Sequence, residues 1–379
     1  MSPITYLDHA ATTPMRREAV EAMLPYLDVQ YANPSGSHRF ARLARTAVDD
    51  AREAVAGVIG CEAGEVVFTG GGTESDNTAI LGGAARRGGT ALCPAVEHHA
   101  VLECVTMLGG PVVGVDPAGA VRLDLLEEAL ALRPDVTVVS VMAVNNEVGT
   151  LTDLAAVSEV VRRTAPQALL HTDAVQAPSW IDLRTISSHV DLLSLSAHKF
   201  GGPKGVGVLV CRKGAVVEPR LVGGGQERER RSGTHNVAGI VATSVALVEA
   251  DAERESERVR LTVLRDRLVD GLTSALDDVL ETVPRDRKVA GSAHVCVAGV
   301  ENEALLFLLD EVGVCASAAS ACAAGAMEPS HVLAAMGIPR AQATGALRLT
   351  LGRTTTEADV ERGVQAVVDA VTRLRRGRR

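Results

Sequence analysis

Lysine is scarce in this sequence, and one lysine stands where a buried strand should end. The lysines of the chain are Lys199, Lys204, Lys213 and Lys288, and arginine supplies nearly all of the remaining positive charge. Lys199 follows the apolar stretch VDLLSLS at 190–196. Burial disfavours the charged ammonium and moves a lysine toward its neutral, nucleophilic form. The sequence therefore predicts an amine that forms a Schiff base with a carbonyl compound.

Two more polar residues, Asn146 and Asp173, follow predicted strands in the same way. In an open α/β sheet, ligands bind beyond the carboxyl ends of the strands, so we expect these side chains to meet Lys199 at one edge. Alone, Asp173 could cap a helix and Asn146 could fix a turn. Together with a Schiff-base lysine, a carboxylate that pairs with a pyridinium nitrogen indicates pyridoxal phosphate.

The stretch FTGGGTESDN at 68–77 supplies the expected phosphate site. Its three glycines allow the backbone to approach a ligand closely. Thr73 and the amides after it would lie at the start of a helix, where an anion is favoured. The alternative is an ordinary tight turn between a strand and a helix.

The stretch VEHHAV at 96–101 carries adjacent histidines. A metal site would need more ligands at suitable spacing, and only Glu97 and Glu103 lie near, so we predict no metal site. A ring stacked on a flat cofactor is the better functional interpretation. A surface histidine with satisfied hydrogen bonds is the alternative, and it fits His99 best.

Two residues near the C-terminus complete the set of candidates. Cys322 lies among small residues in ASAASACAAGAMEPSHV at 316–332, either as a packed, inert thiol or as a nucleophilic thiolate on a loop. Arg348 interrupts the apolar strand pattern of ALRLTLGRTT at 346–355. Its planar guanidinium suits a carboxylate partner, and a salt bridge at a strand edge is the alternative.

The segments that position these residues alternate between strand and helix patterns. Strands are predicted at 65–69, 136–144, 168–173, 190–196 and 205–211, and helices at 73–87 and 152–164. This alternation predicts an α/β fold with a mostly parallel sheet covered by helices. From about residue 249 a long charged helix leads to short strands at 294–300 and 346–352 among further helices. We therefore expect an N-terminal arm (1–14) that packs with the small domain, a large cofactor-binding domain (15–248) and a smaller α+β domain (249–379).

Composition excludes several classes of protein. The chain has 379 residues, 46% of them hydrophobic and only 2% aromatic, so its core must consist of Val, Leu, Ala and Ile. A net charge of −9 argues against direct binding of nucleic acid. No apolar run approaches the roughly 20 residues that span a bilayer. The first residues lack the pattern of a signal peptide. We expect a cytoplasmic protein without a membrane partner, whose seven cysteines are reduced.

The motifs as a set resemble those of cysteine desulfurases of the NifS/IscS-like group, within the fold-type I pyridoxal-phosphate transferases (class-V aminotransferase group). They run in family order from residue 6 to about 357 and cover nearly the whole chain. The matching stretches are YLDHAATTP, NPSGSH, FTGGGTESDN, VEHHAVLE, VNNEVGT, HTDAVQ, SLSAHKFGGPKG, GGGQERERRSGT, SACAAGAMEPSHVL and LRLTLGRTTTE.

The resemblance implies a role for each matching residue. Lys199 would hold pyridoxal 5'-phosphate, Asp173 would pair with its ring nitrogen, His98 would stack on the ring, and Gln176 would contact the phenolic oxygen. The residues implied at the phosphate are Gly72, Thr73, Ser196, His198 and, from the neighbouring subunit of a homodimer, Thr234. Those implied at the substrate carboxylate are Asn33, Asn146 and Arg348.

The resemblance also implies a reaction. L-cysteine would become L-alanine, and its sulfur would pass to Cys322 as a persulfide and then to an acceptor protein, either an iron–sulfur scaffold or a thiolation enzyme. A selenocysteine lyase, or another fold-type I enzyme that does not need Cys322, is the alternative. A cofactor-binding regulator would need a DNA-binding module, which this acidic sequence does not suggest.

Overall fold

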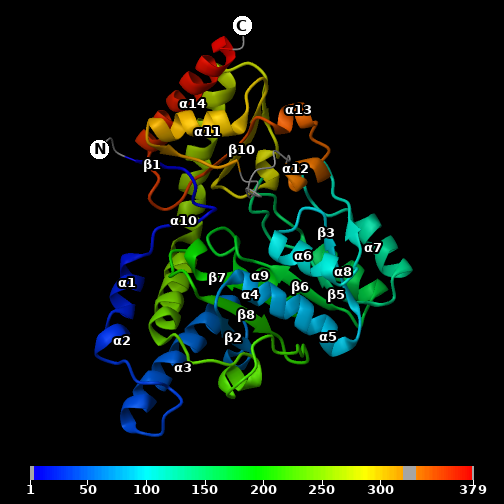
Figure 1. Ribbon diagram of the computed structural model, residues 1–379, viewed down its shortest axis with the longest axis vertical. Helices are drawn as coiled ribbons and strands as arrows, with labels where there is room; N and C mark the ends of the chain where they lie inside the picture. Colours follow the sequence, from blue (N-terminus) through cyan, green and yellow to red (C-terminus); the bar gives the residue numbers. More distant parts are fainter. Residues whose placement is uncertain (1–3, 319–329, 378–379) are drawn as a thin grey trace.

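The computed structural model describes residues 4–318 and 330–377, and its central element is a seven-stranded sheet (Figure 1). The strand order is β2-β8-β7-β6-β5-β3-β4. Its pairings are parallel except at β8, which runs antiparallel to β2 and β7. The α/β fold with a mostly parallel sheet is therefore confirmed. The strands are β2 Val66–Thr69, β3 Thr90–Pro94, β4 Val112–Val113, β5 Val136–Ser140, β6 Leu169–Asp173, β7 Leu192–Ser196 and β8 Gly207–Cys211.

Helices cover this sheet, which explains why its strands are continuous apolar runs rather than alternating ones. Every residue of β2, β3, β6, β7 and β8 is buried. The helices between the strands are α3 Arg39–Ile59, α4 Gly72–Asn77, α5 Gly83–Arg87, α6 His99–Met107, α7 Leu123–Leu132, α8 Leu154–Thr164 and α9 Leu183–Ser187. A π-helical turn, Thr78–Gly82, joins α4 to α5.

A second, three-stranded antiparallel sheet has the order β12-β10-β9. Helix α10 (Val237–Ala275) runs from beside the large sheet to this small one (Figure 1). Its first half packs into the larger core and its second half into the smaller. The remaining elements of this region are β9 Val279–Glu281, β10 Ser292–Val297, α11 Asn302–Glu311, α12 His331–Ala335, α13 Arg340–Ala343, β12 Ala346–Thr350 and α14 Glu357–Gly377.

The N-terminal segment connects the two regions. Strand β1 (Thr5–Tyr6) pairs with β11 (Val314–Cys315), and Leu7 is buried in the smaller core. The chain then crosses to the large sheet, where the Thr13 N–H donates to the carbonyl of His198 at 3.1 Å. Helices α1 (Arg17–Met23) and α2 (Pro25–Asp28) follow and pack on α10. This path brings residues 9–13 to the end of β7.

Two predicted boundaries were wrong. The strand predicted at 136–144 ends at Ser140, because Asn145 folds the next residues into a turn by accepting hydrogen bonds from the N–H groups of Glu147 and Val148. The long helix begins at Val237 rather than near 249, since Asn236 caps it and its first residues are small and buried. It is unbroken at 249, and the domain limits stay a prediction. Within the described ranges, no helix is long and apolar enough to cross a membrane.

Candidate active site

A cavity of about 880 Å³ opens at the carboxyl ends of β6 and β7. Most of the residues singled out in the sequence line it, although they come from separate elements. The structure brings together Gly72, Thr73, His98, Asn146, Asp173, Gln176, Ser196, His198, Lys199 and Arg348.

Lys199 ends a short 3-10 turn, Ala197–Lys199, directly after β7. Its ammonium donates to the carbonyl oxygens of Ala10 at 2.6 Å and Ala11 at 2.9 Å. Burial, together with the positive charge of Arg348, lowers the pKa of Lys199 to about 8. By contrast, the buried lysine Lys288 pairs with Glu281 at 2.6 Å. The Lys199 amine is thus placed to act as a nucleophile near neutral pH.

Asp173 is the last residue of β6 and is 6% exposed. Its Oδ1 accepts a hydrogen bond from the Val175 N–H at 2.8 Å. Burial raises its pKa, and the nearby His98 and Lys199 oppose that rise. A cation such as a pyridinium would hold this carboxylate ionised.

His98 caps α6, and its Nδ1 accepts a hydrogen bond from the Ala100 N–H at 3.1 Å. The neutral ring therefore carries its proton on Nε2. The open part of the side chain faces the cavity, and desolvation by the surrounding protein lowers the pKa of the ring. A neutral, flat ring at the cavity wall can stack on a planar ligand.

The glycine-rich turn forms a backbone cradle that has no room for a side chain at Gly72. Gly71 has a φ of +152°, which favours glycine. A Cβ on Gly72 would lie 2.8 Å from Cγ2 of Val175 and 3.3 Å from Cβ of Ser196. Thr73 and Ser196 bring hydroxyl groups to the same part of the cavity. Backbone N–H groups, hydroxyls and close backbone approach fit a phosphate group.

Arg348 lies on β12 and is 5% exposed. Its guanidinium donates to Asp8 Oδ1 at 2.7 Å and to the carbonyl oxygen of Asn146 at 2.8 Å. Its Nε is buried and has no hydrogen-bond partner within the described part of the chain. The salt-bridge alternative is therefore present, with Asp8 as the partner.

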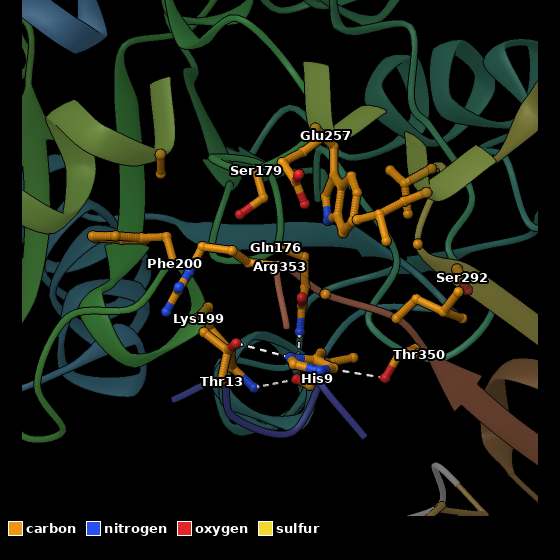
Figure 2. A pocket seen from close by; sticks show the side chains of 18 of the residues that line it. His9, Thr13, Gln176, Ser179, Lys199, Phe200, Glu257, Ser292, Thr350 and Arg353 are labelled. Carbon is orange, nitrogen blue, oxygen red and sulfur yellow. Dashed lines mark hydrogen bonds between the residues drawn. The ribbon is translucent and has the colours of Figure 1, made fainter. Parts of the chain in front are cut away.

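A second, smaller cavity of about 70 Å³ adjoins the first on the other side of residues 9–13. The two share Ala10, Asn146, Gln176 and Lys199 in their walls. Gln176 donates to the Ala10 carbonyl at 2.8 Å, and His9 is hydrogen-bonded to Thr13 at 2.8 Å. In Figure 2 these side chains lie close together, beside Lys199. The N-terminal segment thus forms the partition between the two cavities.

Two predicted residues are not at this cavity. Asn33 and Thr234 lie together in a separate cavity of about 260 Å³. The side chain of Asn33 closes a local turn by accepting a hydrogen bond from the Ser35 N–H at 2.9 Å. Cys322 lies outside the described residues, so its role as sulfur acceptor stays a prediction.

The sequence analysis missed other residues of the site. Asp8 was not predicted, and Glu97 was considered only as a metal ligand. Asp76 lines the cavity, and both it and Glu97 are almost fully buried. The only available signal was an acidic residue within each stretch already assigned to the site, TESDN and VEHH.

The lysine, the buried carboxylate, the histidine and the cradle fit pyridoxal phosphate, and comparison with known proteins agrees. The model of the family "Aminotransferase class-V" matches residues 5–362. The IscS-like cysteine desulfurase of Mycobacterium tuberculosis is 44% identical over 98% of this chain and 98% of its own length. The cysteine desulfurase IscS of Methanosarcina thermophila is 42% identical over 98% of this chain and 92% of its own length.

Solved structures show the same relationship. A NifS-like protein superposes with a TM-score of 0.90 at 34% identity, covering 98% of this chain and all (100%) of that one. The chain therefore belongs to the class-V aminotransferases and, within them, to the pyridoxal-phosphate-dependent cysteine desulfurases of the IscS/NifS type.

Proposed function

We propose that the cavity around Lys199 converts L-cysteine to L-alanine and passes the sulfur to Cys322 as a persulfide. The observation that carries the proposal is the arrangement of Lys199, Asp173, His98 and the glycine cradle around one cavity large enough for cofactor and substrate. The chain is a cysteine desulfurase by family, and the assignment of individual residues is what we add.

Each of the cofactor-binding residues would contact a different part of the cofactor. Bound pyridoxal phosphate supplies an electron sink for bonds to the substrate's α-carbon. Asp173 holds a negative charge against the ring nitrogen, His98 stacks on the ring and Gln176 contacts the phenolic oxygen. The phosphate is held by Gly72, Thr73, Ser196 and His198. Support for this division comes from the positions of these residues around the cavity.

Lys199 is the proton carrier. With a pKa near 8, its amine exchanges a proton close to neutral pH. Its Nζ would take the proton from the α-carbon of the substrate and return a proton to the product. Arg348 and Asn146 would hold the substrate carboxylate, a role supported by the position of both residues in the wall of the cavity.

The sulfur step needs a thiolate. The Cys322 sulfur would attack the substrate sulfur, so that an S–S bond forms while the C–S bond breaks and its electron pair returns to the substrate carbon. The other cysteines are poorly suited, because burial raises the pKa of every one of them: Cys61, Cys93, Cys104, Cys211, Cys296 and Cys315. An acceptor protein then collects the sulfur; whether it is an iron–sulfur scaffold or a thiolation enzyme stays open.

We also propose a homodimer in which Thr234 completes the phosphate site of the partner subunit. Thr234 and Asn33 lie away from the Lys199 cavity of their own chain. Leu27 and Tyr31 line the same cavity and are exposed, and other exposed apolar residues are Leu24, Val29, Leu221 and Val222. A large exposed apolar patch is typical of an interface. The cytoplasmic location stays a prediction from the sequence.

The experiment that tests the sulfur step is Cys322→Ser. The variant should bind cofactor and change its visible spectrum with L-cysteine, because the thiol is not part of the cofactor site. It should form no persulfide and release no sulfide with a reductant. Cys61→Ser is the control and should behave as wild type. Alanine production by Cys322→Ser at the wild-type rate would refute the acceptor role and favour a lyase.

A further inference from the structure

Two buried carboxyl groups near Asp173 have no lysine or arginine partner among the described residues, although buried carboxylates normally require a cation. Asp76 on α4 and Glu97, just before α6, are 1% and 0% exposed. The Oε1 of Glu97 accepts a hydrogen bond from the Met142 N–H at 2.6 Å. The Oδ1 of Asp76 and the Oε2 of Glu97 have no hydrogen-bond partner in the described part of the chain. An ionised carboxylate in that position is costly, whereas a protonated one is not.

The sheet places a row of polar side chains beside Asp76. His171 and Asp173 are two residues apart on β6 and so point to the same face. Ser140 on β5 is in register with His171, and Ser194 on β7 is in register with Asp173. The His171 ring is hydrogen-bonded to Ser140 through Nδ1 at 2.8 Å and to Ser194 through Nε2 at 2.9 Å.

His171 gives the acids no positive charge. Its Nε2 is 3.6 Å from Oδ1 of Asp76, but burial lowers the pKa of the ring to about 3, so the ring is neutral. The Ser194 hydroxyl also contacts Asp76 and favours its ionised form, although burial and the charge of Asp173 outweigh it and raise the pKa of Asp76.

The remaining neighbours act in the same direction. Burial and the charge of Asp173 raise the pKa of Glu97. The thiols of Cys104 and Cys93 are close enough to Asp76 and Glu97 to interact electrostatically. Burial raises the pKa of both thiols, so neither brings a charge. His98 and Lys199 lower the pKa of Asp173 and so favour its ionised form, whereas burial raises that pKa.

We propose that Asp76 and Glu97 are positioning residues that stay protonated near Asp173, so that the single negative charge of the cluster rests on Asp173. Three carboxyl groups that share one buried space cannot all ionise, and the one facing a cation keeps the charge. The inference rests on the proposed function only in that Asp173 faces the ring nitrogen of the cofactor.

Amide substitutions and alanine substitutions should have different effects on cofactor binding. Asp76→Asn and Glu97→Gln keep shape and neutrality, so both should retain the cofactor. The pH at which its visible absorbance changes should stay within about half a unit of wild type, since no charge has been removed. Asp76→Ala removes the hydrogen-bonding group and leaves a cavity, so it should lose cofactor more readily. Asn in its place should restore retention.

Infrared spectroscopy tests the protonation directly, in both cofactor-free and loaded protein. Near neutral pH, the wild type should show the carbonyl stretch of protonated carboxyl groups, shifted in heavy water. Asp76→Asn and Glu97→Gln should each remove a separate part of that band. Glu65→Gln is the matched control: Glu65 is also buried, but hydrogen bonds and Arg212 lower its pKa, so its loss should leave the band unchanged.

A third variant tests the coupling. In Asp173→Asn the charge of the cluster is gone, so one of the two acids should ionise and the band should fade at a lower pH than in wild type. A wild type without the band, or an Asp76→Asn protein whose cofactor titration moves by more than about one unit, would overturn the proposal. A wild type that shows the band but has no desulfurase activity would instead refute the proposed function, while the protonated state of Asp76 and Glu97 would remain supported.

Discussion

Arg348 and Ser317 exchange both of their backbone hydrogen bonds. The Arg348 N–H donates to the Ser317 carbonyl at 2.7 Å, and the Ser317 N–H donates to the Arg348 carbonyl at 3.2 Å. The guanidinium of Arg348 also binds Asp8 and the carbonyl of Asn146. One residue thus connects the N-terminal segment, the turn after β5 and the stretch of chain that leads to Cys322.

We expect Arg348→Lys to weaken substrate binding more than turnover. Lysine keeps the charge but loses the planar fork, and hydrogen bonds to charged groups contribute about 1.5–3 kcal/mol, roughly a 10- to 150-fold change in binding. The KM for L-cysteine should rise accordingly, while kcat changes less. Arg353→Lys, in the wall of the smaller cavity, is the control. Equal KM values for both variants would rule out the carboxylate role.

Cofactor loading should report the pKa of Lys199. Attack on the aldehyde needs the neutral amine, and with a pKa of about 8 roughly a tenth of it is neutral at pH 7, against about one in three thousand for an ordinary lysine. The rate at which cofactor-free protein binds pyridoxal phosphate should therefore rise from pH 7 and level off above about pH 8. Borohydride should then fix the cofactor to Lys199, as peptide mass spectrometry would show. An adduct on Lys204 would refute the assignment.

Asp173→Ala should lose cofactor and nearly all activity. Removing one partner of a buried charge pair costs about 3–5 kcal/mol. Equilibrium dialysis against pyridoxal phosphate measures the weaker binding, and the thermal stability of the cofactor-free variant shows whether it still folds. Asp191→Ala is a useful control, because Asp191 pairs with Arg162 at the amino end of β7, opposite the end at which Lys199 lies. Unchanged cofactor affinity in Asp173→Ala would contradict the role.

Lys199, Asp173 and the glycine turn were predictable because each follows an apolar strand directly. Strand ends lie at one edge of a parallel sheet, so sequence position alone implies proximity. The pairing of Arg348 with Asp8 was not predictable in this way. The two residues are 340 positions apart, and their contact depends on β1 pairing with β11, two short strands with weak sequence patterns.

The burial of Asp76 and Glu97 could not be predicted from the sequence, for a different reason. A charged residue in a helix pattern normally indicates a solvated face, and TESDN gives no sign that Asp76 turns inward. Its burial follows from the packing of α4 against β7 and β8, which brings the Asp76 side chain beside His171. Only the assembled sheet shows that the polar residues of three strands and one helix lie together.

The dimer proposal can be tested by mixing two inactive variants. Thr234→Asp should repel the phosphate, and Lys199→Ala lacks the amine. If Thr234 serves the partner's site, each mixed dimer has one intact site of two. Random mixing makes about half of the dimers mixed, so the mixture should recover about a quarter of the wild-type activity. If Thr234 serves its own chain, no intact site forms and the mixture stays inactive. Light scattering checks that each variant is a dimer.

The last prediction concerns Glu147, which lies next to Asn146 and is 2% exposed. Burial raises its pKa from 4.5 to about 7, against the opposing effects of a hydrogen bond with Ser330 and the charge of Arg348. The folded protein therefore holds a proton at a pH where the unfolded chain has released it. For a carboxyl with a raised pKa, stability declines as pH rises through this interval.

Glu147→Gln should remove that decline. The shift of about 2.5 pKa units corresponds to about 3 kcal/mol, which wild type should lose relative to the variant between about pH 4.5 and 7.5. Urea unfolding at fixed protein concentration measures the difference at each pH. Glu65→Gln should show an effect of opposite sign at lower pH, because hydrogen bonds and Arg212 lower the pKa of Glu65 from 4.5. Wild type should gain stability relative to this variant as pH rises toward about 4.5, and the difference should stay constant above that pH. Parallel curves for wild type and Glu147→Gln would mean that Glu147 is ionised throughout, with its charge balanced by Arg348.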